Sequence, residues 1–116
     1  MTTLGLYIKP ANTQVTMRIQ PADDIVTYVV FVQKWTDAGK EAAATWHPDE
    51  LESAAGASIM LVAARGYDLV LKAQVASETT LQAVLEFDGA TAFDKTVALP
   101  QIEGPVVVRE WSIIIR

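Results

Sequence analysis

Residues 25–32 read Ile-Val-Thr-Tyr-Val-Val-Phe-Val, an almost unbroken run of β-branched and aromatic side chains. Such side chains suit the pleated backbone of a strand better than a helix. An apolar run without alternation is typical of a central strand that is covered on both sides. A second run, at residues 106–115, is apolar on both of its faces, and we expect the same for it.

The segments around these two runs alternate between apolar and polar residues, as half-buried strands do. The alternating apolar positions are Leu4, Leu6 and Ile8; Val15, Met17 and Ile19; Leu69, Leu71, Ala73 and Val75; and Leu81, Ala83, Leu85 and Phe87. We also expect strands over residues 40–46, 58–64 and 91–99. Asp88-Gly89 predicts a tight hairpin, because both central residues of a type I′ turn need a positive φ.

One short helix is expected over residues 48–55. Pro48 suits the first helical position, acidic residues follow it in the first turn, and Gly56 suits the C-terminal cap. Eight or nine short strands and a single helix predict one all-β domain over residues 1–116. Its expected fold is an antiparallel two-sheet β-sandwich, either immunoglobulin-like or jelly-roll-like.

The composition excludes several classes of function. The chain has 116 residues, with 14 acidic against 9 basic side chains, a net charge of −5 and no cysteine. Nucleic-acid binding draws on clustered Lys and Arg, and the basic residues here are scattered, so we expect no nucleic-acid partner. The lack of cysteine excludes disulfides, Cys-based zinc or iron–sulfur sites and a Cys nucleophile. We expect no cofactor.

Neither a membrane span nor a signal peptide is expected. The apolar stretches fall short of the ~20 residues that a helix needs to cross a bilayer. Residues 1–10 lack a basic leader followed by an apolar stretch. A cytoplasmic location is therefore the default expectation, and secretion by a leaderless route or after trimming of a leader stays open.

The titratable residues give little support for catalysis. His47 is the only histidine, and on a helix only Glu50 would share its face, which leaves two metal ligands at most. No Gly-x-Ser-x-Gly motif or phosphate-binding glycine loop occurs. We therefore expect no metal site and no enzymatic activity.

Acidic residues supply the remaining enzymatic alternative, a small hydrolase with paired carboxylates. The Asp88-Gly89 hairpin could bring Glu86 near Asp94, but a glycosidase needs its carboxyls about 5–9.5 Å apart inside a cleft, and short loops build little cleft. Asp23-Asp24 could ligate calcium from a loop, although the spaced acidic pattern of a calcium loop is absent.

Aromatic residues are the best candidates for a ligand-binding site. Trp35 and Trp46 flank the turn at residues 37–40, and a hairpin there would place both near its open end, with His47 alongside. Flat aromatic rings on a sandwich surface bind sugars and peptides, so we name Trp35, Trp46, His47 and Tyr67 as candidates. The competing interpretation is that Trp46 closes the core and Trp35 caps a sheet edge.

The run at residues 106–115 raises a different kind of binding. A strand that is apolar on both faces must be central, covered or paired with another subunit, because an exposed one is a template for aggregation. The sequence therefore predicts a non-enzymatic binding or assembly domain with a protein partner, which includes a homodimer formed by sheet extension or face packing. The first alternative is a lectin-like, carbohydrate-binding module that uses surface aromatics to hold a glycan.

Overall fold

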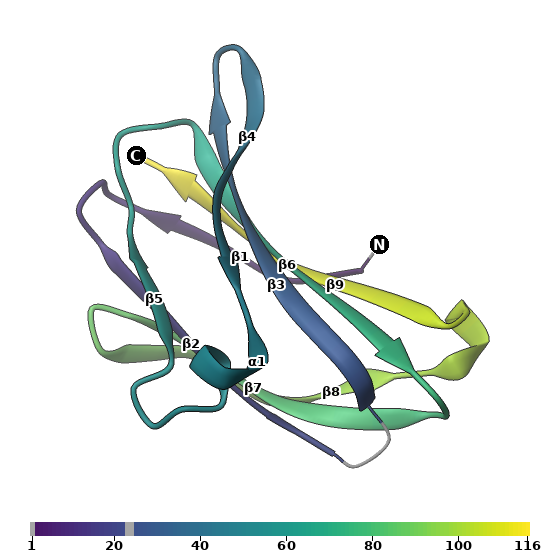
Figure 1. The fold of residues 1–116 in the computed structure, drawn as a ribbon. Helices are drawn as coiled ribbons and strands as arrows, with labels where there is room; N and C mark the ends of the chain where they lie inside the picture. The colour runs from purple at the N-terminus through teal and green to yellow at the C-terminus, as the bar shows by residue number, and fades with distance from the viewer. Residues whose placement is uncertain (1, 23–24) are drawn as a thin grey trace.

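A computed structural model describes residues 2–22 and 25–116 of the chain (Figure 1). The strands are β1 (Thr2–Lys9), β2 (Gln14–Pro21), β3 (Ile25–Thr36), β4 (Gly39–Trp46), β5 (Ala57–Met60), β6 (Gly66–Val75), β7 (Thr79–Phe87), β8 (Ala90–Leu99) and β9 (Val106–Ile115). The helical turns are α1 (Pro48–Leu51) and the 3-10 turn η1 (Gln101–Glu103). Asp23 and Asp24, the calcium candidates, lie outside the described residues.

The strands form two sheets that pack face to face, which confirms the predicted β-sandwich. One sheet has the order β1-β9-β6-β3-β4 and the other the order β5-β2-β7-β8. Every pair is antiparallel except β1 with β9, which run parallel. No tight turn joins these two strands, so nothing local imposes the antiparallel direction that a hairpin would.

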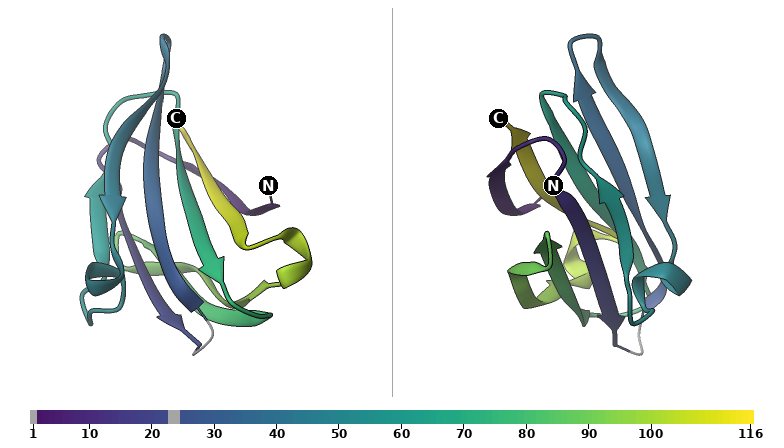
Figure 2. Two further views of the ribbon diagram at one scale, coloured as in Figure 1. Left: turned by 45° about the vertical axis from the view of Figure 1, so that its right-hand side comes forward. Right: turned by 90° about the vertical axis from the view of Figure 1, so that its left-hand side faces the viewer.

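Most connections cross from one sheet to the other (Figure 2). Among the described elements, only β3 with β4 and β7 with β8 are consecutive strands paired in one sheet. In an immunoglobulin domain the last two strands are neighbours, whereas here β8 and β9 lie in different sheets. The β3–β4 hairpin extends beyond the ends of the other strands.

The inner faces of both sheets form the core. The predicted apolar positions of β6 and β7 all point inward and are buried. At the centre, the indole of Trp111 is fully buried and meets the ring of Phe93 edge to face, with the ring centroids 5.5 Å apart. This alternation leaves the other face of each strand on the outside of the sandwich.

The two apolar strands are covered on one face only, so the expectation that both faces would be covered is wrong. β3 and β9 are both flanked by other strands of their sheet. Tyr28 and Val30 of β3 are buried, but Val29 and Phe31 between them are only half-buried. On β9, Val106 remains exposed. A two-layer sandwich has no third layer to cover the outer faces of its strands.

The turn predictions are confirmed at the β7–β8 hairpin. Asp88 and Gly89 have φ values of 50° and 81°, and Phe87 pairs with Ala90 on either side of them. Both residues therefore have the left-handed backbone that a type I′ turn requires. The Asp88 carboxylate also accepts a hydrogen bond from the backbone N–H of Gln14, at 2.8 Å, which ties this turn to the start of β2.

Two elements are shorter than predicted. The helix ends at Leu51 instead of residue 55, and Tyr28 donates a hydrogen bond to Glu52 at 2.6 Å just past that end. β5 ends at residue 60, because Leu61 turns away to exchange backbone hydrogen bonds with Asn12 and Thr13. Hydrogen bonds to residues distant in the sequence thus accompany both ends, and a local pattern does not reveal them.

An ion pair fastens η1 to the inner side of β9. The guanidinium of Arg109 is buried and donates to both carboxylate oxygens of Glu103, at 2.7 and 3.2 Å. It also donates to the backbone carbonyls of Ala98 and Val108. The hydrogen bond from Arg109 lowers the pKa of Glu103 below its usual range, because it stabilises the charged carboxylate.

A pH-dependent loss of stability follows from this pair. A carboxyl with a lowered pKa in the folded state stabilises the protein above its unfolded pKa of about 4.3, and this contribution disappears as the pH falls through the folded pKa. We expect Glu103→Gln to be less stable than the wild type at pH 7 and equal to it once the wild-type carboxyl is protonated. Urea unfolding from pH 7 down to pH 2.5 measures this, and a constant difference across that range would contradict it.

Candidate binding surface on the five-stranded sheet

The four predicted site residues do not share one surface. Trp35 is partly exposed and pairs with Lys40 beside the β3–β4 turn, whereas Trp46 pairs with Val30 near the opposite end of β4. Trp46 and Tyr67 are buried in the core, so their rings do not face solvent. The expected cluster at the open end of the hairpin does not form, because Trp35 lies at the closed end.

His47 precedes α1 and is exposed. Its backbone N–H donates to a carboxylate oxygen of Glu50 at 3.4 Å, and its carbonyl accepts hydrogen bonds from the backbone N–H groups of Glu50 and Leu51. The residue therefore begins the helix. Within residues 2–22 and 25–116, no group of three or more His, Asp or Glu side chains has the geometry to hold a metal ion.

The candidate carboxylates each have a different partner. Glu86 accepts a hydrogen bond from Arg18 at 2.8 Å, Asp94 accepts one from Gln82, and Asp88 caps β2. The hydrogen bond from Arg18 lowers the pKa of Glu86. A general acid at neutral pH needs a raised pKa, so this arrangement does not favour a hydrolase.

The outer face of the five-stranded sheet is rich in apolar side chains. Pairing of the strands places residues in rows across β4, β3, β6, β9 and β1. The three rows nearest the hairpin turn are Lys40, Trp35, Gly66, Ile114 and Ile8; Ala42, Gln33, Asp68, Ser112 and Leu6; and Thr45, Phe31, Val70, Glu110 and Thr3. Further along lie Val29, Lys72 and Val108, and then Thr27, Gln74 and Val106.

Several of these apolar side chains are open to solvent. Leu6 is 64% exposed, Ile8 55%, Val106 50% and Trp35 38%. The outer face of the four-stranded sheet differs, because its outward positions are mainly polar. They include Thr16, Arg18, Gln20, Gln82, Glu86, Asp94 and Thr96. A sheet with one solvated face normally carries polar residues there, so the five-stranded sheet is the exception.

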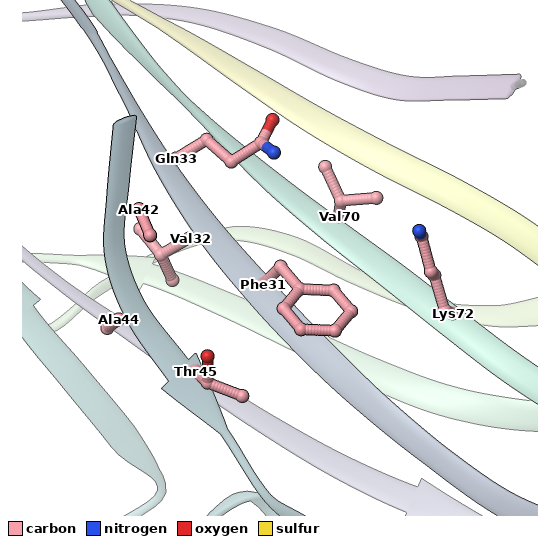
Figure 3. Close-up of a pocket in the computed structure, with 8 residues that line it drawn as sticks. All are labelled: Phe31, Val32, Gln33, Ala42, Ala44, Thr45, Val70 and Lys72. Carbon is pink, nitrogen blue, oxygen red and sulfur yellow. The ribbon is translucent and has the colours of Figure 1, made fainter. Parts of the chain in front are cut away.

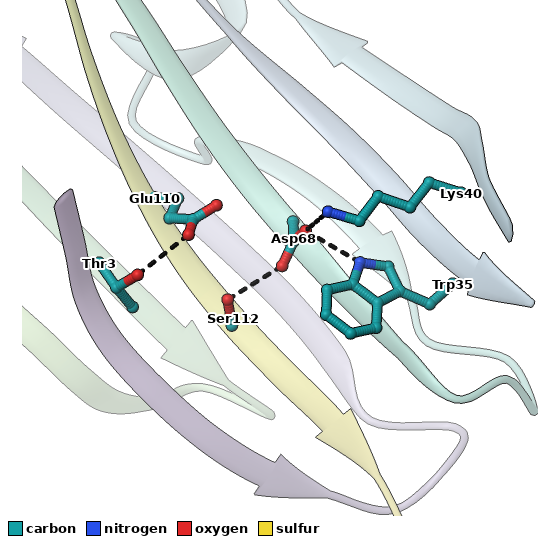
Figure 4. Close-up of polar contacts among 6 residues, drawn as sticks. All are labelled: Thr3, Trp35, Lys40, Asp68, Glu110 and Ser112. Carbon is teal, nitrogen blue, oxygen red and sulfur yellow. Dashed lines mark hydrogen bonds and ion pairs between the residues drawn. The ribbon is translucent and has the colours of Figure 1, made fainter. Parts of the chain in front are cut away.

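A buried carboxylate holds Trp35 in place on this face (Figure 4). Asp68 is only 2% exposed, and its oxygens accept hydrogen bonds from the Trp35 indole N–H at 2.9 Å, the Lys40 ammonium at 3.1 Å and the Ser112 hydroxyl at 2.9 Å. The Lys40 ammonium also lies 4.7 Å from the centre of the Trp35 ring. All of these contacts fix the orientation of the indole.

The sequence prediction missed Asp68, Lys40 and Ser112. The available signal was that Asp68 is the only acidic residue of the strand at residues 66–75 and stands between the apolar side chains of Tyr67 and Leu69. A buried carboxylate is costly unless it is paired and hydrogen-bonded, so such a residue requires partners. Those partners come from β3, β4 and β9, and their proximity depends on strand order.

Four hollows lie along the outer face, the smallest of them, of about 200 Å³, beside Thr27, Val29 and Val106. One, of about 270 Å³, is lined by Phe31, Val70 and Lys72 among others (Figure 3). A second, of about 330 Å³, lies between Lys72, Val108 and Glu110. The third, of about 520 Å³, lies by the hairpin turn. Its lining residues are Trp35, Thr36, Asp37, Gly39, Lys40, Arg65 and Ile114.

Comparisons with protein families, with curated proteins and with solved structures found no match to this chain. The helices of the described residues are all too short to cross a membrane.

Proposed function

We propose that this protein is a non-enzymatic assembly domain that packs the outer face of its five-stranded sheet against the same face of a second copy. The observation that carries the proposal is the unequal character of the two outer faces. Apolar side chains gather on one of them, where Leu6, Ile8 and Val106 are exposed, whereas the other is mainly polar and has Met60 as an exposed large apolar residue at its edge. Contiguous exposed apolar surface is typical of a contact site, and burying it releases water.

Face packing is favoured over sheet extension. The sequence left β9 three options, to be central, covered or paired with another subunit. β9 lies between β1 and β6, so both of its backbone edges are occupied. The open edges of this sheet belong to β1 and β4, and those of the other sheet to β5 and β8. On β4, the charged residues Lys40 and Glu41 discourage strand addition. The exposed apolar side chains project from the face of the sheet, and only a partner above that face covers them.

The charges on this face complement one another across a two-fold axis. Lys72 pairs in register with Val108, and Glu110 pairs with Val70, so the two charges lie on neighbouring rows beside the same hollow. In the described part of the chain, neither takes part in an ion pair. A symmetric contact brings Lys72 of one copy to Glu110 of the other, twice.

A charge swap tests this contact. Sedimentation equilibrium of the wild type is expected to give a dimer. Lys72→Glu and Glu110→Lys each place like charges opposite one another and are expected to weaken the dimer about tenfold or more, and the double variant is expected to restore it.

The control lies outside the proposed interface. Lys95 is an exposed residue of the edge strand β8 in the other sheet, so Lys95→Glu makes the same charge change away from the contact and is expected to leave the mass unchanged. A wild type that stays monomeric at high micromolar concentration overturns the self-contact. A dimer that all three single variants leave intact places the interface on another surface.

A second candidate function, binding of a glycan, is favoured by one observation. Trp35 keeps part of its indole exposed next to the hollow of about 520 Å³, which is within the usual range for small-molecule sites. Trp46 and Tyr67, the other aromatics named for this role, do not contribute because they are buried. The glycan site then rests on Trp35 and on neighbours that the aromatic pattern alone did not identify.

A further inference from the structure

The hollow beside the β3–β4 turn has two apolar walls on different strands. Trp35 of β3 and Ile114 of β9 both pair in register with Gly66 of β6, so they stand on either side of a residue that has no side chain. Gly66 itself does not line the hollow, because its Cβ position is occupied by the β9 backbone, with the carbonyl oxygen of Ile113 2.5 Å away. A volume of about 520 Å³ accommodates one or two sugar rings.

The aromatic wall is held in position before any ligand arrives. The indole of Trp35 donates to the buried Asp68 and is contacted by the Lys40 ammonium, which itself binds Asp68. A ring fixed in this way loses little conformational entropy when a ligand packs against it. Asp68 thus acts as a positioning residue for Trp35.

The rim of the hollow carries two positive charges, and each lies near a carboxylate of the chain, Arg65 near Asp37 and Lys40 against Asp68. Arg65 has a side chain that is 70% exposed, and its closest acidic partner is Asp37 at 3.9 Å, beyond hydrogen-bond distance. The guanidinium donors are therefore free to bind a carboxylate in a bidentate manner. Lys40 lines the same hollow with its ammonium group.

The remaining lining groups suit hydroxyls. Asp37 and Thr36 lie at the tip of the hairpin, and the side chain of Asp37 is fully solvated, so its oxygens can accept hydrogen bonds from a ligand. A ligand for this site therefore needs a ring with an apolar face, several hydroxyl groups and a negative charge. An acidic sugar combines all three.

We propose that this hollow binds a saccharide that carries a carboxylate, with its ring between Trp35 and Ile114 and its carboxylate on Arg65 and Lys40. The inference rests on the second candidate function and adds the class of sugar and the residues that select it. The carboxylate contact is electrostatic and partly exposed, so added salt weakens it.

Titration with digalacturonic acid and with its dimethyl ester tests the proposal, because the two ligands share the same sugar rings and the ester replaces each charged carboxylate by a neutral methyl ester. The acid is expected to quench the fluorescence of Trp35, since Trp46 and Trp111 are buried. Calorimetry is expected to show the ester binding about tenfold more weakly or worse. Arg65→Gln and Trp35→Ala are each expected to lower the affinity of the protein for the acidic saccharide by a similar factor.

Lys95→Gln is the matched control, because it removes one exposed positive charge from the other sheet and is expected to leave the affinity unchanged. Equal binding of acid and ester overturns the selection for a carboxylate but leaves glycan binding intact. If neither the acid nor the ester binds, both the carboxylate selection and the glycan-binding function are overturned. Equal binding of a tetraglutamate peptide overturns the saccharide class. The dimer is measured separately by sedimentation without sugar, so its failure is distinguishable from each of these.

Discussion

Replacement of Trp111 by alanine is expected to lower the free energy of unfolding by about 3–5 kcal/mol, the usual cost of removing a large aromatic side chain from a core. The indole is fully buried on the inner face of β9, and its ring meets Phe93 of the opposite sheet edge to face. The variant therefore loses contacts that join the two sheets, and it leaves a cavity that short strands cannot close. Urea unfolding followed by circular dichroism measures the loss.

Trp111→Phe separates the volume of the ring from its polar atom. The indole N–H of Trp111 is buried and has no hydrogen-bond partner among the described residues. Phenylalanine removes this unsatisfied donor while it keeps most of the ring, so its cost is expected to be less than half that of alanine. Equal costs for the two variants would show that the N–H finds a partner in solution.

Replacement of Gly66 by alanine is expected to cost about 2–3 kcal/mol, because it forces two strand backbones apart. A Cβ atom added at Gly66 would lie 2.5 Å from the carbonyl oxygen of Ile113, which is closer than real contacts allow. That oxygen belongs to the backbone of the neighbouring β9, so no side-chain rotation relieves the clash. Thermal and urea unfolding both report the loss.

Gln74→Ala is the matched control for Gly66→Ala. Gln74 lies on the same strand and its side chain is exposed, so the change is expected to alter stability by less than about 0.5 kcal/mol. An effect of similar size in both variants would mean that β6 tolerates the extra methyl at residue 66. The backbones of β6 and β9 would then separate at residue 66 at little cost in stability.

The fold was largely predictable from local signals. The Asp88-Gly89 turn follows from the positive φ values that these two residues tolerate. The strands around Leu71 and Leu85 follow from the alternation of apolar and polar side chains, and both signals extend over only a few residues. The direction of β1 against β9 was not predictable, since it depends on which distant strands meet. The same limit applies to β3, whose apolar outer face was expected to be covered by other parts of the chain.

The binding surface was predictable only in part. Trp35 was named from its type and its place beside a turn, and it does lie on an outer face. Trp46 looked equivalent, but the hairpin register carries it to the other end and into the core. Asp68 and Arg65 join Trp35 only through strand order and through the loop that precedes β6, and neither is a local property of the sequence.

The parallel pairing of β1 and β9 has a mechanical consequence. Thr2 lies opposite Arg109, and Lys9 lies opposite Ile115, so the first and last strands run side by side in the same direction. Tension applied through both ends of the domain would slide these strands along each other and load their hydrogen bonds together. An antiparallel pair pulled from one end would instead open bond by bond. The parallel β1–β9 pair therefore resists rupture when force is applied through these two terminal strands.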